Sequence, residues 1–274
     1  MLPFIVIVAA LPAEATPLKT HWNLSPTGDT AYRSWHNDDM LLVESGIGKC
    51  NAAAATASAL TGIVNAGIAA KRIICINHGI GGGLYDLGTM VTAHAINDDA
   101  TGQTWYPSLT FKPSGATATV VCVDAPASDY TADTAFDMES SGFYSAARRF
   151  VGAEFIHCFK TISDNPDHDI TTINKARVID LVQGSLASLT QSIDRLVALH
   201  ATAFDTADIE ALVNTVKEKM HLTRTHGHQL RRLLERHQAL HGALPTTATL
   251  LDLKRASVLI STLTQQLDGS VPRY

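Results

Sequence analysis

The sequence predicts an α/β fold, a three-layer sandwich with a central mixed sheet, followed by an all-helical extension at the C-terminal end. Up to about residue 200, short apolar runs alternate with stretches that carry apolar residues at helical spacing. Beyond residue 200 only the helical spacing remains. The chain of 274 residues is 46% hydrophobic, which is enough to bury a substantial core. We therefore predict one α/β domain over residues 1–200 and a helical extension over residues 201–274.

Six strands are predicted from runs of four or five apolar residues, several without the polar alternation of a half-exposed strand. In chain order they cover residues 5–8, 40–43, 73–76, 90–93, 120–123 and 155–159. Helical spacing fills residues 50–69, 138–150 and 174–200 between and after them. Sheets of this class usually bind ligands where strands end and loops begin.

The extension carries three predicted helices, over residues 205–220, 225–241 and 247–267. Ser, Thr or Asp stands near the start of each helix, as is typical of N-terminal capping. The segment from Gly242 to Pro245 separates the last two helices. No strand is predicted there.

Composition argues against several classes of partner. A formal net charge of −5 with 17% charged residues gives no general attraction to nucleic acid or anionic lipid. Residues 51–70 carry no charge, but they are mostly Ala, Thr and Gly, which transfer weakly into hydrocarbon, so no membrane span is predicted. The apolar opening lacks the preceding Lys or Arg of a secretory signal and is predicted to be a buried strand. The four cysteines show no C-x-x-C spacing, which indicates buried thiols in a cytoplasmic protein.

Three carboxylates, Glu14, Glu139 and Asp164, each stand where an apolar stretch meets a predicted turn, and a glycine-rich turn at residues 77–83 lies between the first two. Carboxylates supply protons and hydrogen bonds, and glycines let the backbone approach a ligand, so the pattern predicts an acid/base site for a small polar ligand. Structural roles remain open for each of them. Glu14 and Glu139 are also typical of acids in a first helical turn, and Asp164 precedes Asn165-Pro166 as in an Asx turn.

Other motifs favour structural roles. The segment Ser45–Lys49 could place backbone N–H groups around an anion, although such strand-to-helix turns are more often structural. His221, His226 and His228 match no familiar zinc spacing, so no metal site is predicted. The arginines of residues 231–236 could form a basic face for nucleic acid, but nearby acidic residues favour a solvated surface.

The order of these motifs resembles the nucleoside phosphorylase/nucleosidase superfamily, most of all the 5′-methylthioadenosine/S-adenosylhomocysteine nucleosidases and related bacterial nucleosidases. The resemblance covers residues 3 to about 195, and no single motif is specific by itself. It depends on finding all of the motifs in order: Ala10-Leu11-Pro12-Ala13-Glu14, Ser45-Gly46-Ile47-Gly48-Lys49, Asn77 to Leu84, Gly88-Thr89-Met90-Val91, Asp137-Met138-Glu139 and Ile162-Ser163-Asp164.

This resemblance implies hydrolysis of the N-glycosidic bond of a purine nucleoside. Glu14 would deprotonate the attacking water, and Asp164, oriented by Ser163, would protonate or hydrogen-bond N7 of the purine. Glu139 would bind the ribose hydroxyls, and Met138 would lie against the sugar. These roles fit the charges of the reaction, because cleavage builds positive charge on the ribose and negative charge on the base.

The resemblance also implies that Gly81 and Gly82 contact the substrate and that no metal or organic cofactor takes part. The expected partner is a small nucleoside substrate, with no nucleic acid and no membrane. Because proteins of this superfamily commonly form dimers in which a neighbouring subunit helps close the site, a homo-oligomer, a dimer, is expected.

The sequence departs from the family pattern in three places. His78 and Ile80 stand where nucleosidases carry Thr and Ser, so one hydroxyl contact is missing. The stretch between residues 98 and 136 is short and lacks an evident base-stacking aromatic, for which Tyr130 or Phe136 is a substitute. The helical extension lies outside the resemblance.

Two alternatives remain open. A phosphate-dependent nucleoside phosphorylase needs cations to hold phosphate, and the cations nearest the motifs in the sequence are Lys49, Arg148 and Arg149. The Gly-x-Pro-x-Arg stretch typical of trimeric phosphorylases is absent, which favours water as the nucleophile. A non-catalytic nucleoside-binding protein that acts through its helical tail is the other alternative.

Overall fold

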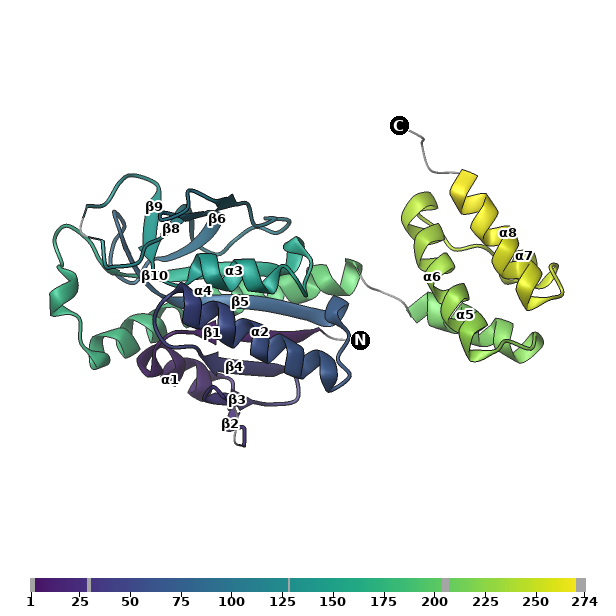
Figure 1. The fold of residues 1–274 in the computed structure, drawn as a ribbon, viewed down its shortest axis with the longest axis horizontal. Helices are drawn as coiled ribbons and strands as arrows, with labels where there is room; N and C mark the ends of the chain where they lie inside the picture. The colour runs from purple at the N-terminus through teal and green to yellow at the C-terminus, as the bar shows by residue number, and fades with distance from the viewer. Residues whose placement is uncertain (1–2, 29–30, 128, 204–206, 270–274) are drawn as a thin grey trace. The chain divides into compact units, whose positions relative to one another are not determined.

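The computed structural model describes residues 3–28, 31–127, 129–203 and 207–269. The chain divides into two compact units, residues 1–203 and residues 204–274. The first is an α/β unit, and the described residues of the second form helices and their connections (Figure 1). The predicted fold class is confirmed.

The α/β unit is built on one mixed sheet of ten strands. Neighbours β4, β1, β5 and β10 run parallel, as do β6, β8 and β9. Antiparallel pairing of β10 with β6 and of β5 with β9 joins these groups, so β5, β10, β6, β8 and β9 close into a ring. The strands are β1 (Phe4–Ala9), β2 (Ser25–Pro26), β3 (Ser34–His36), β4 (Met40–Glu44), β5 (Ile73–Gly83), β6 (Met90–Asp98), β7 (Thr104–Trp105), β8 (Ala116–Cys122), β9 (Thr134–Asp137) and β10 (Ile156–Asp164).

Helices cover the sheet in two layers, α1 packing with α4 and α2 packing with α3 (Figure 1). The helices of this unit are α1 (Pro12–His21), α2 (Lys49–Asn65), α3 (Ser140–Ala147), α4 (Lys175–Ala203) and the 3₁₀ turns η1 (Ala70–Arg72), η2 (Ala153–Phe155) and η3 (Ile170–Thr172). Strands β1, β5 and β10 form the centre of the core, since almost all of their residues are buried. This explains why each of them begins with a largely apolar run rather than with the polar alternation of a half-exposed strand.

All six predicted strands are present, but the predicted glycine-rich turn at residues 77–83 is wrong. These residues are the second half of β5, which pairs with β10 from Cys75 to Gly82 and with β9 at its end. Glycine normally weakens a strand. Here close neighbours leave no room for side chains, because a Cβ on Gly81 would lie 2.7 Å from the carbonyl oxygen of Phe136.

The second unit contains α5 (Ala207–Lys219), α6 (Arg224–His241), α7 (Thr247–Leu251) and α8 (Ala256–Gly269). Its own core consists of apolar residues from all four helices, among them Val213, Leu234, Leu250 and Leu263. The prediction of one helix over residues 247–267 is wrong. The helix stops after α7, and Lys254 adopts the left-handed backbone conformation (φ 52°) before α8 begins. Residues 205 and 206, predicted as a helix start, lie outside the described residues.

The cysteines differ in their exposure. Cys75, Cys122 and Cys158 are buried and free, whereas Cys50, on α2, is exposed, so the prediction of buried thiols is wrong for that residue. Within the described parts of the chain, no helix is long and apolar enough to span a bilayer.

Candidate active site

One cavity of about 200 Å³ lies where β1, β5 and β10 end. Parallel strands end at the same edge of a sheet, which brings segments distant in the sequence together there. All the predicted site residues line this cavity: Glu14, Gly81, Gly82, Met138, Glu139, Ser163 and Asp164. The lining also includes apolar residues that the sequence did not single out, among them Leu11, Ile47 and Ile170.

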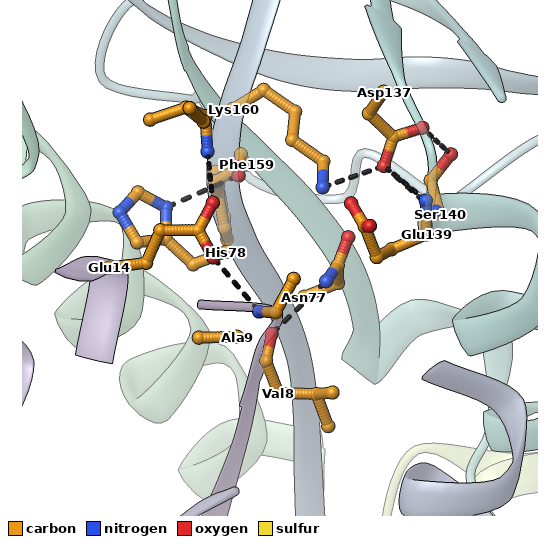
Figure 2. Close-up of polar contacts among 12 residues, drawn as sticks. Val8, Ala9, Glu14, Asn77, His78, Asp137, Glu139, Ser140, Phe159 and Lys160 are labelled. Atoms are coloured by element: carbon orange, nitrogen blue, oxygen red, sulfur yellow. Dashed lines mark hydrogen bonds and ion pairs between the residues drawn. The ribbon is translucent and has the colours of Figure 1, made fainter. Parts of the chain in front are cut away.

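Glu14 lies in the first turn of α1, five residues after β1 ends, and is only 2% exposed. Its Oε2 accepts hydrogen bonds from the backbone N–H groups of Ala10 (2.9 Å) and Leu11 (2.8 Å), and Oε1 accepts one from Ile80 (2.9 Å). Burial raises the pKa of Glu14, and these hydrogen bonds together with the charge of Lys160 only partly oppose the increase. The carboxylate is therefore held in a fixed orientation with an increased affinity for a proton (Figure 2).

The backbone of β5 passes directly against this carboxylate. A Cβ on Gly79 would lie 2.7 Å from Glu14 Oε1, too close for any side chain. We expect Gly79→Ala to displace the carboxylate and to lower the free energy of unfolding by about 1–3 kcal/mol, as overpacking does elsewhere. Chemical denaturation measures this, with Gly184→Ala as the matched control. Gly184 lies inside α4 with no atom near its Cβ position, so that variant is expected to be at least as stable as the wild type. Equal stability of both variants would contradict the close contact.

Glu139 stands directly before α3 and is 7% exposed. The capping role that the sequence left open belongs to Asp137, whose Oδ2 accepts from the backbone N–H of Ser140 (2.8 Å) and whose Oδ1 accepts from its hydroxyl (2.6 Å). Glu139 is thereby left to face the cavity, where Oε1 accepts from the N–H of Gly48 (2.9 Å). The Ser45–Lys49 segment thus binds a carboxylate of the protein itself. Burial, together with the charge of Asp137, raises the pKa of Glu139 to about 7 although Lys160 opposes the increase.

Lys160 is a charged residue of this site that the sequence analysis missed. It lies in β10, is 1% exposed, and its Nζ is 2.7 Å from Asp137 Oδ2 (Figure 2). Burial by itself lowers the pKa of Lys160, but the carboxylates of Asp137 and Glu139 outweigh burial and raise it, so the side chain stays charged. A signal was present in the sequence, because Lys160 directly follows the predicted strand at residues 155–159, and a buried lysine is almost never left unpaired.

The cations predicted to lie nearest the site do not line the cavity. Lys49 forms ion pairs with Asp98 (3.3 Å) and Asp124 (2.9 Å). Arg148 and Arg149 are exposed at the end of α3. Lys160, in contrast, lies close to the carboxylates of Asp137 and Glu139.

Asp164 ends β10 and is 2% exposed. Its Oδ1 accepts a hydrogen bond from the hydroxyl of Ser163, and its Oδ2 accepts one from the hydroxyl of Tyr130. The Asx turn that the sequence left open is made by the next residue, because Asn165 Oδ1 accepts from the N–H of Asp167 (3.1 Å). Asp164 is therefore free of a turn role and contributes its carboxylate to the cavity wall.

The residues that depart from the family pattern lie in or next to the cavity. His78 is fully buried beside Lys160, and its Nδ1 is 3.2 Å from the carbonyl oxygen of Phe159. Burial, followed by the charge of Lys160, lowers the pKa of His78 to about 4, so the imidazole is neutral. Ile80 lines the cavity, as does Phe136. Tyr130, the other predicted aromatic, contacts Asp164 instead.

Comparisons with known proteins give a fold but no sequence match. No family profile matches this sequence, and no curated protein sequence is similar to it. Solved structures are similar. The apo 5′-methylthioadenosine nucleosidase of Arabidopsis thaliana has a TM-score of 0.58 at 17% identity and covers 71% of this chain and 96% of its own. The 5′-methylthioadenosine/S-adenosylhomocysteine nucleosidase of S. pneumoniae, bound to a transition-state inhibitor, has a TM-score of 0.56 at 19% identity over 70% of this chain and 99% of its own.

A futalosine hydrolase mutant of Helicobacter pylori is also similar, with a TM-score of 0.55 at 13% identity, covering 70% of this chain and 99% of its own. Each of these proteins is matched over nearly its whole length, whereas this chain is longer than any of them. The predicted resemblance is therefore confirmed at the level of the fold, because the chain shares the fold of these two nucleosidases and of the futalosine hydrolase.

Proposed function

We propose that the protein hydrolyses the N-glycosidic bond of a purine nucleoside of the methylthioadenosine or S-adenosylhomocysteine kind. The observation that carries the proposal is the convergence of Glu14, Glu139 and Asp164 on one cavity. These residues come from three distant parts of the chain, and all three are buried, although burying a carboxylate is unfavourable unless it is bonded or has a function. The fold shared with nucleosidases agrees with this reaction.

The proposed reaction forms one bond and breaks one bond. The oxygen of a water molecule attacks C1′ of the ribose while the bond from C1′ to N9 of the purine breaks. Glu14 takes a proton from the water, a role that suits a fixed carboxylate whose pKa is raised by burial. Asp164 gives a proton to N7, so the base leaves as a neutral molecule.

The remaining cavity residues bind the substrate. Glu139 accepts hydrogen bonds from the ribose hydroxyls, and Met138 lies against the sugar. Gly81 and Gly82 let the backbone of β5 approach the nucleoside, and Ser163 orients Asp164 through their hydrogen bond. Negative carboxylates on the sugar side stabilise the positive charge that develops on the ribose as the bond breaks.

Charge favours water over phosphate as the nucleophile. Besides the proton donor Asp164, the cavity wall holds the carboxyl groups of Glu14, Asp137 and Glu139, and the buried cation Lys160 is already paired with Asp137. A phosphate dianion entering this site would meet repulsion without a free cation to bind it.

The test is release of adenine from methylthioadenosine by the purified protein, measured with and without phosphate. We expect the same rate in both buffers. Release that depends on phosphate would indicate a phosphorylase, and binding without release would indicate a nucleoside-binding protein. Either outcome would overturn the proposal.

We further propose that the protein acts in the cytoplasm, as its cysteine pattern indicates, and that it forms a homodimer, as the resemblance implies. We also propose that residues 201–274 form a helical extension to the catalytic domain. The extension's own apolar core supports its independence as a folding unit. Sedimentation of the full chain tests the predicted dimer.

A further inference from the structure

The hydroxyl group of Tyr130 donates a hydrogen bond to Asp164 Oδ2. The other oxygen of this carboxyl group, Oδ1, accepts a hydrogen bond from the hydroxyl of Ser163. Both oxygens of the proposed general acid are therefore engaged by side chains of the protein. The chemistry proposed above does not use Tyr130. In the sequence it lies in the connection between β8 and β9, without a motif that would mark it.

Packing places the Tyr130 hydroxyl at a specific point of the cavity edge. A Cβ on Gly82, which lines the cavity, would lie 2.8 Å from the hydroxyl oxygen and 2.6 Å from Cε1 of the Tyr130 ring. The ring centroid lies 5.9 Å from that of Phe136, another cavity residue. The chain is anchored just beyond the tyrosine, where Thr134 Oγ1 donates to the carbonyl oxygen of Thr131 (2.6 Å).

We propose that Tyr130 limits how tightly the site binds a base, because its hydroxyl competes with the base for Asp164 Oδ2. This inference rests on the proposed function, in which position 7 of the purine meets Asp164. A base that offers a hydrogen-bonding partner at position 7 must displace the tyrosine hydroxyl from Oδ2. A base without such a partner gives up the hydrogen bond between Tyr130 and Asp164 and gains nothing in return, so the site rejects it.

The competition has a measurable consequence for a ligand with an N–H group at position 7. 9-Deazaadenine carries this donor, whereas 7-deazaadenine has a C–H group there. We expect Tyr130→Phe to bind 9-deazaadenine about five- to tenfold more tightly than the wild type, since the ligand no longer has to break the hydrogen bond between Tyr130 and Asp164. The KM for methylthioadenosine is expected to fall by a similar factor with kcat unchanged.

Isothermal titration of both analogues with the full-length protein tests this. The matched control is Tyr85→Phe, because the Tyr85 hydroxyl bonds to the carbonyl oxygen of Thr117 (3.4 Å) and not to Asp164; it is expected to bind both analogues as the wild type does. Unchanged or weaker binding of 9-deazaadenine by Tyr130→Phe, or a fall in its kcat, would overturn the role of Tyr130.

A different result would indicate that the proposed function itself fails. If the wild type binds the 9-deaza and 7-deaza analogues equally, or binds neither of them, Asp164 does not meet position 7 of a purine. Thermal melting of Tyr130→Phe serves as the folding check. A melting temperature within about five degrees of that of the wild type is expected, since one hydrogen bond is lost while the aromatic ring and its contact with Phe136 remain.

Discussion

Asp164→Asn is expected to lower the rate of base release by about 10²- to 10⁴-fold, the usual contribution of a positioned proton donor. An amide has nearly the shape of the carboxylic acid, and its one oxygen can still accept a hydrogen bond from the hydroxyl of Ser163 or of Tyr130. It cannot give a proton to N7. The variant is therefore expected to fold and to bind nucleoside while failing to cleave it. Single-turnover release of adenine from methylthioadenosine measures the loss.

The matched control is Asp167→Asn, three residues further along the chain. Asp167 is exposed, and only its backbone N–H takes part in the Asx turn of Asn165. This variant is expected to keep the activity of the wild type. Retention of base release by Asp164→Asn to within a few-fold would remove Asp164 from the mechanism.

Lys160→Met is expected to lower the free energy of unfolding by about 3–5 kcal/mol, because removing one partner of a buried ion pair leaves the other charge uncompensated. The ammonium group is 2.7 Å from Asp137 Oδ2 and 1% exposed, so water cannot replace it without rearrangement. Loss of the cation also removes a charge that lowers the pKa of Glu14 and of Glu139. Without this charge the pKa values of both carboxyl groups rise further, so both groups are protonated over a wider pH range. We therefore expect the rate of base release to fall as well as the stability.

Urea denaturation of Lys160→Met measures the change in the free energy of unfolding. Lys175→Met is the matched control, since Lys175 is exposed at the start of α4. In an Asp137→Asn background the same Lys160→Met change is expected to cost markedly less, because the partner charge is already gone. Equal costs in the two backgrounds would show that the Lys160–Asp137 pair is not coupled.

The strands of the core were predictable because a strand buried on both faces carries a run of apolar residues, whatever its neighbours are. β1, β5 and β10 each carry such a run. The glycines of β5 were not placed correctly, because the reason for them lies in residues far away in the sequence. Gly79 makes room for Glu14, and Gly82 makes room for Asp164 and Tyr130. Local turn preferences cannot reveal such contacts.

The seven predicted site residues all line one cavity. The sequence around them, however, did not indicate which cation balances the negative charge of the carboxylates. Asp137 was known only as part of a motif, and Lys160 lay just outside the predicted strand at residues 155–159. Their ion pair joins β9 to β10, and the pairing order of these strands is a property of the folded sheet. Likewise, the hydrogen bond between Tyr130 and Asp164 depends on the path of a connection that carries no motif.

The most direct test of the proposed chemistry is the fate of the attacking oxygen. The purified protein is incubated with methylthioadenosine in phosphate-free buffer made with ¹⁸O-labelled water, and the products are identified by mass spectrometry. We expect free adenine and a ribose product that carries one ¹⁸O atom, formed by the wild type and lost in Asp164→Asn. Absence of base release, or release that requires phosphate and yields a sugar phosphate without the label, would contradict hydrolysis at this site.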